Sequence, residues 1–457
     1  MAGKHSQPNI LFIMADQFRH DYLGCAAASP ARTPNLDRVA ARGARFTQCA
    51  SNGPVCSPAR IGLACGLQPC RVGALDNGAY LPASITTYYQ RLRDYGFRVG
   101  CAGKLDLAKP SPYNGRAGDR PCVYGYGFTH PIEIEGKMHA GKHATPMGPY
   151  GFYLQERGLY QKFHEDYVAR AGHDWVKGVC HDSVLPADAF ADVYIGRRAV
   201  EWIEAIGDDF PWHFFVSFVG PHSPFDPPTE YAGRWRSTPM PDAIQDSMEK
   251  KPAWAKRRQR GLSPQEVSIT RRQYCAAIEV IDDQIGAILE AVERRGMMDH
   301  TIILFSSDHG EMLGDHGAYA KSLPYEAALR VPLLAAGPGI AEGRTCDALV
   351  ELIDVNPTIC ELAGLPPQEG IDARSFAPIL RGETDQHRTE QIAALRGFEC
   401  LRTQNHKLIH NEHDRDELYD LATDPNELNN IAAEQPGITR SLSARLRRRF
   451  LEGEWRR

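Results

Sequence analysis

Four short apolar segments of this chain each run directly into a polar or charged residue. They are rich in Val, Ile, Phe and small residues, which favours buried strands. In an open α/β sheet, functional groups collect just beyond the carboxyl ends of the parallel strands. We therefore expect four distant junctions to meet in space: residues 10–15 before Asp16, 98–102 before Lys104, 214–219 before His222, and 301–307 before Asp308 and His309.

Helical periodicity is clearest over residues 274–295, where isoleucines recur at three- and four-residue steps before Gly296. A further apolar segment, 331–336, predicts another central strand. Strands alternating with helices predict an α/β fold with a large, mostly parallel sheet sandwiched by helices. Residues 105–186 are rich in Gly, Pro, Tyr and His without sustained periodicity, so we expect long loops over the site.

The last part of the chain changes character. Turn residues interrupt the pattern near 364–367 and 381–383, and short strand-like pieces follow at 392–395 and 407–409. A basic helix is expected over 438–450. These signals predict a larger α/β domain over residues 1–380. A smaller C-terminal α+β subdomain, with an antiparallel sheet and a helix, is expected over 381–457.

Composition narrows the class of protein. The 457 residues carry 52 Lys+Arg and 57 Asp+Glu, so the net charge of -5 argues against a nucleic-acid binder that relies on overall positive charge. Twelve cysteines are too dilute for a disulfide framework. The first apolar run is too short to span a membrane, so no membrane partner is expected. The cytoplasm is the default location, although a removed leader would leave no trace in this chain.

The sharpest local motif is Cys56-Ser57-Pro58-Ala59-Arg60. Pro58 fits the first turn of a helix, whose free N–H groups favour an anion. Arg60 adds a guanidinium that can contact a tetrahedral oxyanion through two N–H groups. Alone, such a five-residue pattern recurs by chance, and Cys56 would then be one more buried thiol.

The strand ends and this motif occur together and in order, and nearly the whole chain resembles the sulfatase family of the alkaline phosphatase superfamily. The resemblance implies an alkaline phosphatase-like fold. It also implies a hydrolase of sulfate esters, with a sulfated carbohydrate or small organic sulfate as substrate. The segments that carry it include PNILFIMADQ, NGPVCSPARIGLACGL, YGFRVGCAGK, PHSPFDPP, FSSDHGEMLGDHG and ELYDLATDPNELNNIA.

By this resemblance, a separate maturation enzyme oxidises Cys56 to formylglycine, whose hydrated aldehyde carries two hydroxyl groups. One hydroxyl attacks the sulfur of the ester, and the other expels sulfate by reforming the aldehyde. The resemblance also places one divalent cation between this group and four side chains. We expect Ca²⁺, with Mn²⁺ next and Mg²⁺ as a third choice, held by Asp16, Gln17, Asp308 and His309.

The remaining polar residues surround the expected sulfate. Lys104 and Lys321 match the family's positive groups beside Arg60, and His222 is the candidate general acid for the leaving oxygen. One position departs from the family pattern, because Asp106 stands where many members have a histidine after Gly-Lys. Asp106 is expected to accept a proton or contact a substrate hydroxyl.

Two other functions stay open. A phosphonate monoester or phosphodiester hydrolase of the same superfamily uses the same nucleophile and metal residues, but its members tend to lack the lysine found here at Lys104. A non-catalytic protein that binds sulfated glycans is the second alternative, given Asp106 and the untested state of Cys56. A homo-oligomer is possible. Six histidines of the loop region are expected to be loop residues, some of them facing substrate: His130, His139, His143, His164, His173 and His181.

Overall fold

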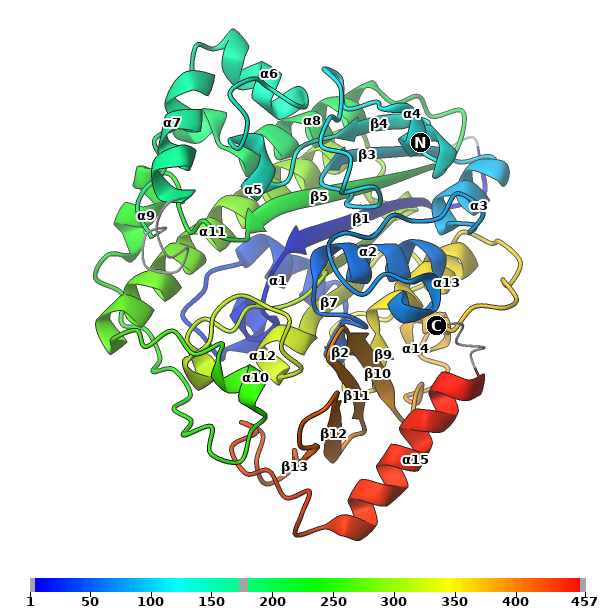
Figure 1. Cartoon of the computed structure of the whole chain (residues 1–457). Helices are drawn as coiled ribbons and strands as arrows, with labels where there is room; N and C mark the ends of the chain where they lie inside the picture. Colours follow the sequence, from blue (N-terminus) through cyan, green and yellow to red (C-terminus); the bar gives the residue numbers. More distant parts are fainter. Residues whose placement is uncertain (1–4, 172–179, 453–457) are drawn as a thin grey trace.

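The computed structural model describes residues 5–171 and 180–452. Its core is one large sheet whose central strands run parallel (Figure 1). Among the sheet strands, β7 runs against both of its neighbours, β6 and β2. The spatial order is β4 (His130–Glu133), β3 (Arg98–Gly103), β5 (Trp212–Pro221), β1 (Asn9–Asp16), β6 (Thr301–Ser307), β7 (Arg330–Ala336), β2 (Gly43–Ala50) and β8 (Arg344–Cys346), with β9 (Val350–Glu351) also paired to β2.

Helices cover both faces of this sheet (Figure 1). The side chains of β1 alternate between two buried clusters, Leu11 and Ile13 facing one and Ile10 and Phe12 the other. This alternation follows from the two-residue period of a strand. The first face is covered by α1 (Pro34–Ala41), α8 (Ala191–Ala205) and α11 (Pro264–Arg294), and the second by α2 (Cys56–Cys65), α3 (Tyr88–Asp94) and α13 (Val355–Leu362).

The predicted α/β architecture is confirmed, and two details differ. Helix α11 begins at Pro264, ten residues before the expected start, because Ser263 and Glu266 form a capping box ahead of a polar first stretch. Residues 105–186 are not all loop. They contain α4 (Pro121–Gly125), α5 (Lys137–Ala140), α6 (Pro149–Glu156) and α7 (Tyr160–Ala171).

A second, antiparallel sheet lies at the C-terminal end, as predicted. Its strands are β10 (Gln391–Leu395), β11 (Phe398–Arg402), β12 (His406–Asn411) and β13 (Glu417–Asp420). Helix α15 (Pro436–Glu452) lies beside this sheet (Figure 1). Its Leu442 and Leu446 belong to one buried cluster with Leu401 and Leu408 of the sheet. The expected boundary at residue 380 stays a prediction. Shorter helices lie between these elements: α9 (Thr229–Trp235), α10 (Ala253–Lys256), α12 (Glu326–Leu329) and α14 (Ala377–Leu380).

A buried polar cluster joins the small sheet to the large domain. The Lys407 Nζ atom, which is fully buried, donates to Glu326 Oε1 at 2.9 Å and to Glu427 Oε1 at 2.7 Å. Arg402 Nε donates to the same Glu326 carboxylate at 3.0 Å. Glu326 opens α12 only five residues after Lys321. The small sheet therefore holds the chain close to one of the expected site residues.

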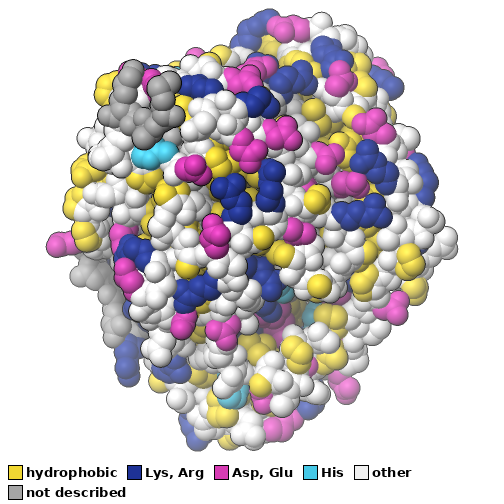
Figure 2. Space-filling model, turned by 180° about the vertical axis from the view of Figure 1, so that it is seen from behind, with side chains coloured by type: hydrophobic (Ala, Val, Ile, Leu, Met, Phe, Trp, Pro, Cys, Tyr) yellow, Lys and Arg dark blue, Asp and Glu magenta, His cyan; other side chains and the backbone are white. Residues whose placement is uncertain are grey.

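The surface has no strong charge asymmetry on the face that Figure 2 shows. Basic and acidic side chains alternate across the described part of that face, and neither sign forms a continuous area. Within residues 5–171 and 180–452, no helix is both long and apolar enough to cross a membrane.

Candidate active site

The four strand ends singled out in the sequence lie side by side, because β3, β5, β1 and β6 are consecutive in the sheet. They deliver Lys104, His222, Asp16 and Asp308 to one edge. Gly103, at the end of β3, has φ 120°, and a Cβ there would lie 1.9 Å from the carbonyl oxygen of Ser217. Only glycine allows this close approach of the two strands.

Cys56 is the first residue of α2 and is buried at the same edge. Its Sγ atom lies 3.3 Å from His309 Nε2 and 3.7 Å from Asp16 Oδ1. Ligand atoms of Asp16, Cys56, Asp308 and His309 all fall within 4.8 Å of one another. The sequence motif and two strand ends thus meet in one compact group.

The orientation of His309 suits a metal ligand. Its Nδ1 atom lies 2.9 Å from the carbonyl oxygen of Gly310, so the hydrogen bond places the ring proton on Nδ1. Nε2 then points its lone pair at the carboxylates, 3.6 Å from Asp16 Oδ1 and 3.7 Å from Asp308 Oδ1. Two buried carboxylates and an imidazole nitrogen fit a divalent cation.

Gln17 lies at the edge of this group but is engaged elsewhere. Its Oε1 atom accepts a hydrogen bond from Lys321 Nζ, and its Nε2 atom donates to Glu311 Oε2. Its backbone N–H donates to Asp308 Oδ1 at 3.0 Å. Gln17 has φ 72°, which is uncommon for a residue other than glycine and is typical of functional sites. The side chain thus connects the carboxylate group to Lys321.

Arg60 lies on the same helix as Cys56, one turn further along. Its Nε atom donates to Asp308 Oδ2 at 2.8 Å. Its Nη1 atom donates to the carbonyl oxygen of Lys104 at 2.8 Å and to Ser217 Oγ at 2.7 Å. Nη2 is buried and has no hydrogen-bond partner among the described residues. Since buried donors are rarely left unpaired, this nitrogen is available to an anion.

Two lysines add positive charge around Cys56. Lys104 Nζ contacts Asp16 Oδ2 and lies 3.2 Å from Asp106 Oδ2. Burial opposes ionisation of the Cys56 thiol, yet Lys104 and Lys321 hold its pKa well below the usual range. Burial also opposes the charge of Lys104, but Asp106 and Asp16 raise its pKa. The pocket therefore stabilises negative charge at position 56.

His222 follows β5 and pairs with Lys321. Its Nδ1 atom faces the carbonyl oxygen of Ser223, and its Nε2 atom contacts Lys321 Nζ. Burial and the neighbouring Lys321 lower the pKa of His222. In this arrangement the Lys321 ammonium donates a hydrogen bond to the Nε2 atom of His222.

Sequence reasoning missed two polar groups that border the site. Glu311 is fully buried and contacts the Gln17 amide; it lies two residues after His309 in the Ser-Asp-His-Gly-Glu segment. Lys109 Nζ donates to Asp106 Oδ2 at 2.6 Å. Its spacing of three residues from Asp106 was visible in the sequence, but it carried no motif.

Among the loop histidines that the structure describes, His139 on α5 is the one that borders Lys104 and Asp106. Its pKa responds to Lys109, Asp106 and Lys104, although burial has the largest effect on it. The Nδ1 atom of His164 donates a hydrogen bond to the carbonyl oxygen of Gly141 at 2.8 Å. His173 lies outside the described residues.

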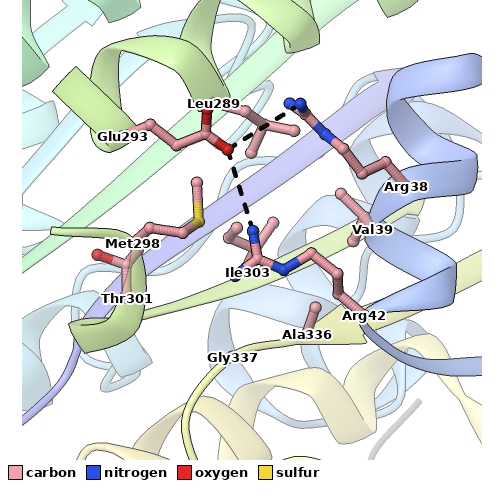
Figure 3. A pocket seen from close by; sticks show the side chains of 10 residues that line it. All are labelled: Arg38, Val39, Arg42, Leu289, Glu293, Met298, Thr301, Ile303, Ala336 and Gly337. Carbon is pink, nitrogen blue, oxygen red and sulfur yellow. Dashed lines mark ion pairs between the residues drawn. The ribbon is translucent and has the colours of Figure 1, made fainter. Parts of the chain in front are cut away.

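A separate pocket lies at the opposite end of the strands, where β6 begins (Figure 3). Figure 3 shows Glu293 between Arg38 and Arg42. The Glu293 Oε1 atom lies 4.0 Å from the Nη1 atom of each arginine. The cavity holds about 20 Å³, enough for about one water molecule. It is too small for an organic substrate.

The fold and this site define a hydrolase of the alkaline phosphatase superfamily. The family model described as "Sulfatase" matches residues 8–365, and the chain belongs to the sulfatase family. A second model, "N-sulphoglucosamine sulphohydrolase, C-terminal", matches residues 314–453. The chain is a sulfuric ester hydrolase, which agrees with the sequence prediction.

Several known proteins are similar over almost the full length. A choline-sulfatase from Rhizobium meliloti is 29% identical, covering 94% of this chain and 83% of the relative. An N-acetylglucosamine-6-O-sulfatase from Bacteroides thetaiotaomicron is 26% identical, covering 93% and 82%. The crystal structure of a phosphonate monoester hydrolase from Agrobacterium radiobacter has the same fold, with a TM-score of 0.83 at 24% identity over 98% of this chain and 96% of that one.

Proposed function

We propose that this chain hydrolyses sulfate esters of carbohydrates with a formylglycine derived from Cys56. The observation that carries the proposal is the position of Cys56. It opens a helix within 4.8 Å of two carboxylates and an imidazole, with Arg60 and two lysines beside it. A maturation enzyme of the formylglycine-generating type is the implied partner.

The same group is proposed to hold one divalent cation, with Ca²⁺ favoured over Mn²⁺ and Mg²⁺. Asp16, Asp308 and His309 would be its ligands together with the side chain at position 56. Gln17 completes the expected set if its amide turns from Lys321 toward the carboxylates. When bound, the cation would polarise the sulfuryl oxygens and increase the acidity of the hydroxyl group at position 56.

The chain's own residues would bind the sulfate and supply a proton. The unpaired Arg60 Nη2 donor and the ammonium groups of Lys104 and Lys321 suit the nonbridging oxygens. His222 is proposed as the general acid, and the Lys321 ammonium that donates to its Nε2 atom would supply the proton that His222 passes to the leaving oxygen. Arg60 and Lys104 are buried, which excludes bulk water from them and strengthens their interactions with an anion.

The choice of sulfate over phosphonate or phosphodiester rests on Lys104, which related phosphonate hydrolases tend to lack. The two relatives named above are a choline-sulfatase and an N-acetylglucosamine-6-O-sulfatase. Their substrates share the sulfate group but differ in the alcohol that carries it. A carbohydrate alcohol is favoured because Asp106 and the surrounding side chains are hydrogen-bonding groups.

The test is to produce the protein with and without a formylglycine-generating enzyme. Mass spectrometry of the peptide that contains Cys56 reports the modification, and turnover of nitrophenyl sulfate reports the activity. We expect sulfatase activity only in the modified protein. Intact cysteine after co-production, together with no turnover, would favour a glycan-binding protein without catalysis. Equal or faster turnover of a phenyl phosphonate monoester would favour the phosphonate hydrolase.

A further inference from the structure

Asp106 faces two lysines beside the proposed sulfate position. Its Oδ2 atom accepts a hydrogen bond from Lys109 Nζ at 2.6 Å and lies 3.2 Å from Lys104 Nζ. The side chain of Asp106 is 8% exposed and that of Lys109 is 13% exposed. Asp106 also has φ 57°, a left-handed backbone conformation in which the extended path of the preceding strand does not continue. The pair therefore lies just inside the surface, next to the reacting group.

His139 approaches the same place from α5. A Cβ atom on Gly136 would lie 3.5 Å from Lys104 Cε and 3.9 Å from His139 Nδ1. The imidazole and the lysine stem therefore border the same small space. The ring is partly exposed, and neither ring nitrogen is hydrogen-bonded to a residue within the described ranges.

We propose that Asp106, Lys109 and His139 form a subsite that binds hydroxyl groups of the sugar next to the sulfate ester. This inference rests on the proposed function. It adds the residues that would recognise the alcohol to which the sulfate is esterified. Asp106 supplies a carboxylate acceptor and Lys109 an ammonium donor. His139 supplies one donor and one acceptor, the pattern that a sugar hydroxyl can satisfy in both directions.

The charges favour a hydroxyl group over a second anion. Lys109 is already paired with Asp106, so the two contribute little net charge. Burial and then Lys109 lower the pKa of His139 to about 4, while Asp106 acts against this; Lys104 and Lys142 act with Lys109. The imidazole is therefore neutral near neutral pH. A neutral ring beside an ion pair suits a polyol.

The same groups disfavour an apolar alcohol. An aryl ring placed against them would displace water from the Asp106–Lys109 ion pair without replacing its hydrogen bonds, and it would leave the two ring nitrogens of His139 without partners. Sites built to bind a hydroxyl group discriminate strongly against a ligand that lacks it, because their polar groups are then left unpaired. The subsite should therefore affect sugar sulfates more than aryl sulfates.

The experiment compares two substrates of the modified protein, N-acetylglucosamine-6-sulfate and nitrophenyl sulfate. For His139→Ala and Lys109→Met, kcat/KM on the sugar sulfate should fall by about tenfold or more relative to the aryl sulfate. His143→Ala, a loop histidine outside this subsite, is the matched control and should leave the ratio unchanged. Thermal unfolding identifies variants that fail to fold, and His139→Gln then replaces His139→Ala.

Binding provides a second measurement that needs no turnover. Calorimetry with Cys56→Ser protein and N-acetylglucosamine-6-sulfate should show weaker binding when His139→Ala is added. Equal losses on both substrates, with unchanged sugar binding, would overturn the subsite. A wild-type protein that hydrolyses nitrophenyl sulfate but no member of a panel of sugar sulfates would also overturn it. Loss of both activities in fully modified wild-type protein would instead contradict the proposed function.

Discussion

The Nε2 atom of His309 lies 3.3 Å from the Sγ atom of Cys56, although 253 positions separate them in the chain. The residue expected to become the nucleophile therefore shares its environment with an imidazole and two carboxylates. Any change to this group should alter metal content and turnover together.

Replacing Asp308 should remove the cation. Asp308→Asn takes away a carboxylate charge and leaves Arg60 Nε facing a neutral amide at the 2.8 Å contact. We expect loss of bound metal in atomic spectroscopy and a fall in kcat of at least about a hundredfold. Asp282→Asn is the control, since it changes another buried carboxylate that binds the start of α1. Full metal occupancy in Asp308→Asn would contradict the assignment.

Cys56→Ala should abolish turnover and leave the fold intact. Removing one sulfur atom creates little cavity, so the free energy of unfolding should change by no more than about 1 kcal/mol. Chemical denaturation and the nitrophenyl sulfate assay measure the two effects. Turnover that survived at more than a trace would mean that the nucleophile lies elsewhere. Cys65→Ala, on the same helix but away from the cluster, should retain activity.

His222→Ala should discriminate between leaving groups. An alkoxide needs a proton as it departs, whereas an activated aryl oxide does not. We expect kcat on a sugar sulfate to fall by about 10²- to 10⁴-fold, with a much smaller loss on nitrophenyl sulfate. A Brønsted plot over aryl sulfates of graded leaving-group pKa should steepen in the variant. An unchanged slope would exclude His222 as the proton donor.

Removing the Lys407 ammonium alone from its buried cluster should strongly lower the free energy of unfolding. Lys407→Met leaves the carboxylates of Glu326 and Glu427 close together without their shared ammonium. Loss of one partner of a buried ion pair costs about 3–5 kcal/mol, measured by chemical denaturation. The double variant Lys407→Met/Glu427→Gln should be less destabilised than the single one, because Glu427 is the carboxylate that loses its ammonium partner, whereas Glu326 keeps Arg402. If the double variant were the less stable, the charge explanation would be wrong.

The protein should become less stable as the pH is lowered, partly because of His213. This histidine is fully buried, its Nε2 atom has no partner among the described residues, and burial lowers its pKa to about 3 from an ordinary value of 6.5. Between these values the unfolded chain binds a proton that the folded chain does not. The free energy of unfolding therefore decreases as pH falls from about 6.5 toward 3, by up to about 1.4 kcal/mol per pH unit for this group.

His213→Phe should remove that contribution and flatten the profile between pH 6.5 and 5. Denaturation midpoints measured across this range provide the test. His413→Asn, at a side chain that is 91% exposed, is the control and should keep the wild-type slope. A His213→Phe profile parallel to the wild type would show that other groups carry the dependence.

The sheet and the meeting of its strand ends were predictable because apolar runs and their polar ends are local signals. The direction of β7 was not, since a buried strand has the same pattern whether it runs parallel or antiparallel. Helices α6 and α7 were missed because Gly and Pro at their ends resemble loop signals. The start of α11 depended on a capping box rather than on the apolar period.

The sequence predicted which residues would lie together at the candidate site, but it did not predict their hydrogen-bond partners. Gln17 and Asp106 both have positive φ, and these conformations decide that one meets Lys321 and the other Lys109. Local sequence does not specify a left-handed conformation at Gln or Asp. Glu311 likewise becomes a partner of Gln17 only through the fold of the segment that follows β6.

The burial of Cys56 has a consequence in time. Its side chain is 1% exposed in the folded protein. A maturation enzyme that must bind this segment therefore cannot reach it after folding. The carboxylate and histidine that enclose it come from residues 308 and 309, which leave the ribosome some 250 residues later. Synthesis itself therefore provides an interval in which the cysteine is accessible, and folding ends it. The fraction of active molecules would then depend on the rate of modification relative to the rate of folding.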